Sequence, residues 1–104
     1  MALNPLTNEE RARAREKATA ARTARAEVKK ALRDGTMNVA QVLERAGTDE
    51  AISRLKVTDL LEATPGIGKV RSAAIMEQLR IAPTRRVRGL GHHQRRALVE
   101  YLDR

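Results

Sequence analysis

Residues 64–71 read Thr64-Pro65-Gly66-Ile67-Gly68-Lys69-Val70-Arg71, and this stretch decides the fold. A helical pattern over 60–63 leads into it, and a second, from about 68 to 79, leads out of it. Glycine can take a positive φ and has no Cβ to shield its amide, so the two glycines around one apolar residue predict a tight turn with a bare backbone. The stretch therefore predicts two helices joined by a hairpin, with Ile67 as its buried anchor.

The hairpin is also the first candidate binding site. Its amides fall at the start of the helix over 68–79, where the helix dipole favours an anion, and two cations lie in the same turn. We predict that it holds a nucleic-acid phosphate through Pro65, Gly66, Gly68, Lys69 and Arg71. The alternative is an ordinary turn between packed helices.

The amino-acid composition indicates which class of nucleic acid the protein binds. The chain has 104 residues and a net charge of +8, and Arg outnumbers Lys 16 to 5, which favours bidentate phosphate contacts. Phe and Trp are absent and Tyr101 is the sole aromatic, which argues against stacking on single strands. Duplex DNA, or structured RNA held by its backbone, fits better.

The first segment, 1–35, is predicted to be one long basic helix. It has no Gly or Pro between Thr7 and Asp34, Thr7 and Glu10 match a capping box, and Gly35 is a natural stop. Its length would be roughly 40 Å. Large apolar residues occur only near its C-terminal end, so we expect the rest to project into solvent and to fray at its start.

One face of this helix is basic. Six cations fall within a sector of roughly 80° at 3.6 residues per turn. We predict that the C-terminal half of this face contacts nucleic acid through Arg22, Arg25, Lys29 and Arg33. The alternative is a solvated helix on which Glu16 and Glu27 pair locally with these cations.

The second segment, 36–104, is predicted to be a compact helical DNA-binding domain. Asn38 with Gln41 predicts a cap for a helix that ends before Gly47, Thr48 is expected to cap the next helix, and a further helix spans 57–63. No stretch alternates with period two, so we expect no strands. The fold class is therefore all-α.

A weaker copy of the hairpin follows 23 residues later. Gly66-Ile67-Gly68 returns as Gly89-Leu90-Gly91, again ahead of an amphipathic helix. The densest basic cluster stands directly before it. We predict a second nucleic-acid contact surface at Arg85, Arg86, Arg88, Gly89 and Gly91, the alternative being a solvated loop.

Other function classes have little support. His92 and His93 diverge by about 100° on a helix and there is no Cys, so we expect no metal or cofactor. Acidic residues are few and fall at exposed helical positions, so we expect neither an enzyme nor a small-molecule substrate. The lack of Cys, of a membrane-length apolar run and of a signal-peptide core predicts a cytoplasmic protein without a membrane partner.

The residues quoted for the hairpin and for 85–91, together with the Ala/Arg helix around Arg25-Ala26-Glu27-Val28-Lys29, closely resemble the actinobacterial integration host factors. The likeness covers almost the whole chain and departs at position 64, where Thr replaces an expected Leu. It implies an all-helical nucleoid-associated protein with a helix–two-turns–helix module. Such proteins bind duplex DNA with little sequence preference, bend and compact it, and affect phage integration, supercoiling and transcription.

These inferences converge on a monomeric architectural protein that binds double-stranded DNA. If the hairpin and the cluster at 85–88 lie on different faces, one molecule would touch two duplex segments. Two alternatives stay open: a structured-RNA or ribosome-associated binding protein, and a fragment of a DNA glycosylase or nuclease.

Overall fold

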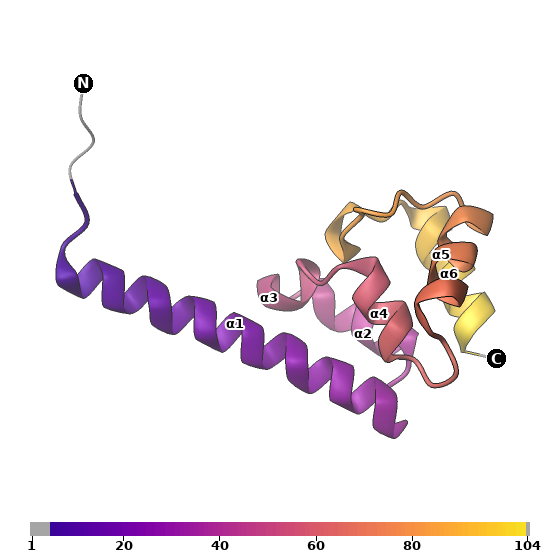
Figure 1. Ribbon diagram of the computed structural model, residues 1–104, viewed down its shortest axis with the longest axis horizontal. Helices are drawn as coiled ribbons and strands as arrows, with labels where there is room; N and C mark the ends of the chain where they lie inside the picture. The colour runs from indigo at the N-terminus through magenta and orange to yellow at the C-terminus, as the bar shows by residue number, and fades with distance from the viewer. Residues whose placement is uncertain (1–4, 104) are drawn as a thin grey trace.

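The computed structural model describes residues 5–103 and is built from helices (Figure 1). Over these residues the elements are α1 (Asn8–Asp34), α2 (Val39–Ala46), α3 (Glu50–Ser53), α4 (Val57–Ala63), α5 (Lys69–Gln78), the short 3-10 helix η1 (Val87–Gly89) and α6 (His92–Leu102). No strand occurs among them. The predicted all-α class with a long N-terminal helix is confirmed.

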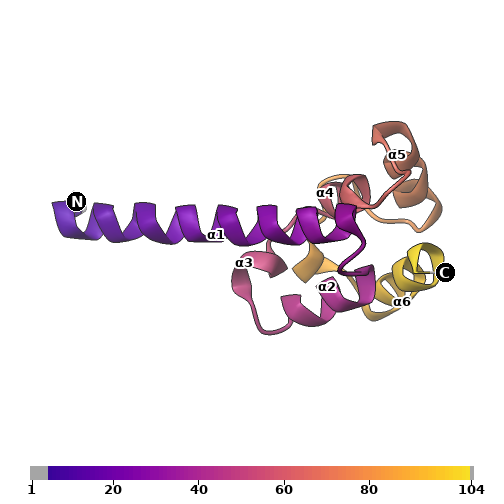
Figure 2. The ribbon, with the colours of Figure 1, turned by 90° about the horizontal axis from the view of Figure 1, so that it is seen from below.

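Helix α1 begins and ends at the predicted residues. The Thr7 hydroxyl accepts from the Glu10 amide at 3.1 Å, and the Thr7 amide donates to the Glu10 carboxylate at 3.3 Å. Gly35 ends the helix with a φ of 77°. Only Val28 and Leu32 of α1 are buried, so its C-terminal end packs against the other helices while the rest extends away from them (Figures 1 and 2).

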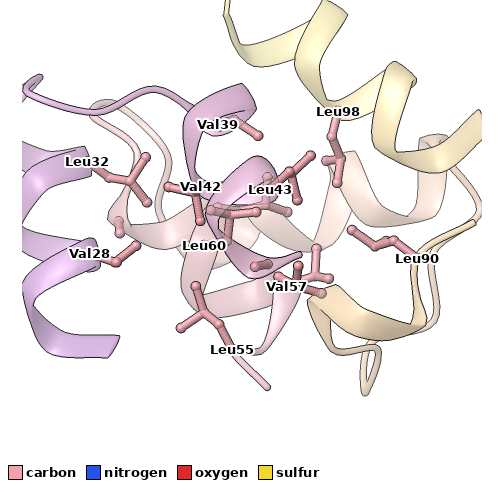
Figure 3. Packing of buried hydrophobic residues seen from close by; sticks show 14 of the residues in the cluster. Val28, Leu32, Val39, Val42, Leu43, Leu55, Val57, Leu60, Leu90 and Leu98 are labelled. Atoms are coloured by element: carbon pink, nitrogen blue, oxygen red, sulfur yellow. The ribbon is translucent and has the colours of Figure 1, made fainter. Parts of the chain in front are cut away.

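The core is arranged around α4 (Figure 3). Val57, Leu60 and Leu61 of this helix are completely buried, with 0% of each residue exposed. Val28 and Leu32 of α1 belong to the same cluster, to which every other helix also contributes at least one buried residue. Burying these side chains is the main source of stability in a chain with so few aromatic groups.

The caps of the short helices largely follow the sequence prediction. Asn38 and Gln41 form the expected capping box of α2. The prediction that Thr48 caps α3 is wrong: the Asp49 carboxylate accepts from the Ala51 amide at 3.0 Å, and the Thr48 hydroxyl donates to the Arg45 carbonyl at 3.3 Å. Thr48 follows the α2 terminus so closely that its hydroxyl satisfies a carbonyl of that helix instead.

A single antiparallel bridge joins two distant segments within residues 5–103. Lys56 lies opposite Arg86, with the Val57 amide donating to the Arg85 carbonyl at 3.0 Å and the Val87 amide donating to the Leu55 carbonyl at 2.9 Å. Lys56 is the N-cap of α4 and offers no side-chain acceptor. The bridge therefore satisfies the first amide of α4 and anchors the chain that follows α5.

Asp103, near the end of the chain, caps α2 from a distance. Its carboxylate accepts from the Val39 amide at 3.0 Å and from the Ala40 amide at 2.8 Å. These are the first two amides of α2, where the helix dipole favours a negative charge. The contact ties α6 to α2 across the core.

We expect Asp103→Ala to lower the free energy of unfolding by about 2 kcal/mol, because two hydrogen bonds to a charged group are lost and both amides become unpaired. Urea unfolding followed by circular dichroism would measure this. Asp34→Ala is the matched control: its carboxylate makes only an exposed ion pair with Lys30 at 2.7 Å, so a change of at most about 0.5 kcal/mol is expected. Equal effects of the two substitutions would contradict the capping role.

Candidate nucleic-acid interface

The hairpin between α4 and α5 needs one left-handed residue. Gly66 has a φ of 85°, while Gly68 has a φ of −91° and a ψ of −172°. Of the two glycines, only Gly66 uses the left-handed region, since Gly68 is an N-cap residue and is extended. Ile67 is buried, with 8% of its surface exposed, as the sequence predicts.

Thr64 braces the turn where the sequence departs from the expected Leu. Its hydroxyl donates to the Leu60 carbonyl at 3.1 Å, and its own carbonyl accepts from the Ile67 amide at 3.2 Å. Two hydrogen bonds thus close the end of α4 and the first half of the hairpin. With Thr in place of the expected Leu at position 64, a side-chain hydrogen bond helps to fix the turn.

The backbone of the hairpin is bare. A Cβ added at Gly66 or at Gly68 would meet no atom within 4 Å. Helix α5 has no side-chain cap and no acidic residue in its first turn. The first amides of a helix lack intrahelical partners, so these donors and the positive end of the dipole face open space.

Cations surround these amides. Lys69 and Arg71 are exposed, as are Pro65, Gly66 and Gly68. Neither cation belongs to the ion pairs between described side chains, which are Arg13–Glu9, Lys30–Asp34 and Arg54–Glu50. We name residues 64–71 the hairpin surface; its free donors and uncompensated charges suit a phosphate.

The second glycine pair repeats this geometry only in part. Gly91 is the extended N-cap of α6 with a φ of −71°, and Leu90 is buried like Ile67. Gly89, however, ends a 3-10 turn, and the Gly91 amide donates to the Gln94 side chain at 3.0 Å. Gly91 therefore opens α6 as Gly68 opens α5, with the difference that Gln94 occupies the amide of the cap residue itself.

The arginines before this turn are held in place by backbone carbonyls. Arg85 donates to the Gly89 carbonyl at 3.0 Å, and Arg86 donates to the Arg54 carbonyl at 2.7 Å. A Cβ at position 89 would lie 2.9 Å from Cδ of Arg85, so glycine there lets the arginine lie across the turn. Each guanidinium has five N–H donors, and those left over can still meet an anion.

A groove of about 900 Å³ runs between α1 and the segment that contains α3 and the bridge. We call it the α1 groove. Its basic lining residues are Lys17, Arg22, Arg25, Arg54, Lys56, Arg86 and Arg88, and its acidic ones are Asp49, Glu50 and Asp59. A smaller hollow of about 300 Å³ adjoins it and is lined by Thr84, Arg85, Arg86, Arg88 and Gly89 among others.

The four residues predicted to bind nucleic acid on the basic face of α1 do not all line the same surface. Arg22 and Arg25 line the α1 groove, and Arg25 donates to the Ala51 carbonyl at 3.2 Å. Lys29 and Arg33 do not line it. Only the first two therefore share a surface with Arg86 and Arg88.

Sequence reasoning missed three basic residues of this groove, namely Lys17, Arg54 and Lys56. Lys56 directly opposes Arg86 across the bridge, an arrangement of like charges that is unfavourable without an anion. The two residues are far apart in the chain, so only the folded arrangement reveals the pair. For Lys17, the sequence signal is its position on the long basic helix.

The two candidate surfaces lie at different ends of the helical body. The hairpin is close to the C-terminal end of α1, whereas the chain after α5 crosses to the side on which α3 lies (Figures 1 and 2). Contacts of η1 with α3 agree with this placement. The hairpin surface and the α1 groove are thus separate cationic surfaces on one chain.

We also searched the described part of the chain for a metal site and for a membrane-spanning helix. Residues 5–103 contain no group of three or more His, Cys, Asp or Glu side chains suited to a metal ion. The His92 and His93 rings are 6.1 Å apart in an edge-to-face arrangement. Over the same residues, no helix has both the length and the apolar character needed to cross a bilayer.

The helical body and its hairpin define a class of domain. Residues 32–102 match the family model of the S13-like H2TH domain, which runs from the end of α1 through α6. At the level of the whole chain, the protein belongs to the integration host factor family. It is 57% identical to integration host factor of Mycolicibacterium smegmatis over 99% of this chain and 98% of the relative.

Two further comparisons agree. Integration host factor of Streptomyces coelicolor is 51% identical over 90% of this chain and 88% of its own. A solved structure of sIHF bound to an 8-bp palindromic DNA superposes with a TM-score of 0.81 and 45% identity, covering 84% of this chain and 98% of that one.

The left-handed backbone at Gly66 gives a direct test of the hairpin geometry. Gly66→Ala should lower the free energy of unfolding by about 1–2 kcal/mol, because a left-handed φ is costly for a residue with a Cβ. Gly66→Asn should cost less, since Asn tolerates that conformation and the surroundings are open in both cases. Chemical unfolding of the wild type and the two variants would measure these differences. A Gly66→Ala variant as stable as the wild type would contradict the left-handed conformation at position 66.

Proposed function

We propose that this chain binds duplex DNA through its backbone phosphates, largely independently of sequence, as a nucleoid-associated architectural protein. The observation that carries this proposal is the hairpin surface, where unpaired amides at the start of α5 adjoin Lys69 and Arg71, neither of which has an acidic partner. An amide-lined helix start with added cations is a general phosphate site. The DNA in the sIHF structure supports the same class of ligand.

The finer roles rest on the separation of the two cationic surfaces. A duplex on the hairpin surface leaves the α1 groove free, so one monomer can hold two duplex segments or bend a single long one around itself. Either mode compacts DNA without oligomerisation. We further propose that the protein acts in the cytoplasm on the nucleoid, supports phage integration, supercoiling and transcription control, and catalyses no reaction.

The proposed contacts fall into two groups. The hairpin surface uses Pro65, Gly66, Gly68, Lys69 and Arg71. The α1 groove and its rim use Arg22, Arg25, Arg85, Arg86, Arg88 and Gly89. We include Lys17, Arg54 and Lys56 because they line the same groove. Lys29, Arg33 and Gly91 lie outside both lining sets and are proposed as peripheral contacts.

Salt dependence tests the phosphate contacts. With about six phosphates neutralised, the logarithm of the association constant should fall against the logarithm of salt with a slope near −5. Lys69→Ala and Arg86→Ala should each reduce that slope by about 0.9 and weaken binding to any duplex sequence. Fluorescence anisotropy with random-sequence duplexes would measure both quantities.

Arg45→Ala supplies the control, because this exposed arginine in the last turn of α2 lines neither surface. A wild-type slope near zero would contradict the electrostatic mechanism. Unchanged affinity in both site variants would contradict the site assignment. Tighter binding to structured RNA than to DNA in direct competition would favour the RNA alternative.

Stoichiometry tests the two-surface arrangement. Short duplexes should saturate at two per monomer in sedimentation at low salt, since each surface accepts one segment. Arg86→Ala combined with Arg88→Ala should reduce this to one while keeping the hairpin-bound duplex. Saturation at one duplex by the wild-type monomer would contradict the arrangement.

A further inference from the structure

Val70 is an apolar side chain in the middle of the hairpin surface. It is 87% exposed, more than Leu6 at 55%, the other exposed large hydrophobic residue in the described part of the chain. Valine contributes little to folding from such a position, and its branched side chain slightly disfavours a helix. An acidic residue would stabilise the first turn of α5 better. A binding role therefore explains this residue better than a folding role.

Its place on α5 is defined by the helix geometry. At about 100° per residue, Val70 falls on the side of α5 opposite Ile75 and Met76, which are buried in the core. Lys69 and Arg71 lie on either side of it. The methyl groups of Val70 therefore stand between two cations on the outermost face of the helix.

Nothing on the next turn covers this position. The residues three and four places further along α5, Ala73 and Ala74, are both exposed and have small side chains. Each of these side chains is a single methyl group, so the apolar surface continues over them without interruption by a polar group. An extended partner can therefore lie along Val70 and reach the amides at the helix start.

The pattern of this surface matches one strand of DNA. A DNA strand alternates charged phosphates with sugar rings whose edges are largely apolar. A phosphate that accepts from the amides of α5 and pairs with Lys69 or Arg71 would bring an adjoining sugar to the same turn, where Val70 is the exposed apolar side chain. A deoxyribose offers C–H groups there, whereas a ribose would place a 2′-hydroxyl against a valine that cannot hydrogen-bond to it.

We propose that Val70 packs against the deoxyribose next to the bound phosphate and thereby favours DNA over RNA at the hairpin. The inference rests on the proposed function, of which it specifies the ligand. The cations and amides set affinity for any nucleic-acid backbone, and Val70 adds a contact that does not involve charge. The residue therefore acts on specificity.

The test compares Val70→Thr with Val70→Ile. Threonine keeps the branched shape and replaces one methyl with a hydroxyl, while isoleucine keeps the apolar surface. Burying one methyl group is worth about 0.8 kcal/mol, so Val70→Thr should weaken duplex DNA binding about fourfold. The salt slope should stay at the wild-type value, since no phosphate contact is lost, and Val70→Ile should bind DNA like wild type.

An RNA duplex of the same sequence gives the second readout. Val70→Thr should not weaken RNA binding, because its hydroxyl can pair with the 2′-hydroxyl, so the DNA-to-RNA affinity ratio falls at least about fourfold. Leu6→Thr is the control for removing an exposed apolar side chain elsewhere and should alter neither affinity. Thermal unfolding should show all three variants folded, because both positions are exposed.

The outcomes separate this inference from the proposed function. Unchanged DNA affinity in Val70→Thr, an equal loss for DNA and RNA, or a reduced salt slope would each overturn the role of Val70 while leaving phosphate binding intact. A wild-type protein that does not bind duplex DNA in a salt-dependent way would instead overturn the proposed function itself.

Discussion

Burial of α4 is the interaction on which the rest of the structure depends. This helix spans only seven residues and lacks a side-chain N-cap, so it has little stability of its own. Leu60 and Leu61 are completely buried, and both α1 and α5 pack against the helix. Its start is held by the bridge between Lys56 and Arg86, and its end leads directly into the hairpin. The core contacts that stabilise α4 therefore also place the two cationic surfaces.

The two surfaces differ in how they present positive charge. The hairpin surface offers backbone donors and a helix dipole, with Lys69 and Arg71 at its margin, and its shape is set by a single left-handed glycine. The α1 groove offers side chains, two of which, Arg25 and Arg86, are fixed by carbonyls of α3 and of the turn that follows it. Backbone donors impose a register on a bound phosphate, whereas a wide groove of arginines tolerates many positions of a strand. The pair suits a ligand that is uniform in charge and variable in sequence.

Sequence reasoning predicted what local chemistry determines. The capping boxes at Thr7 and Asn38, the hairpin anchored by Ile67 and the restricted core contribution of α1 all follow from short-range patterns, and the structure agrees with them. It failed where two nearby groups compete, as when Thr48 caps the end of one helix in place of the start of the next. The sequence alone could not place Lys56 opposite Arg86. Nor could it show which cations on the basic face of α1 line the groove, because both arrangements depend on packing between segments distant in the chain.

The like charges at the bridge link the fold to binding. Lys56 and Arg86 oppose one another across a bridge whose hydrogen bonds also start α4, so repulsion between them acts directly on the element that organises the core. A phosphate between the two side chains would replace this repulsion with two attractions. Any ligand that binds only the folded chain stabilises it by mass action. A polyanion in the groove would therefore also reinforce the segment that starts α4.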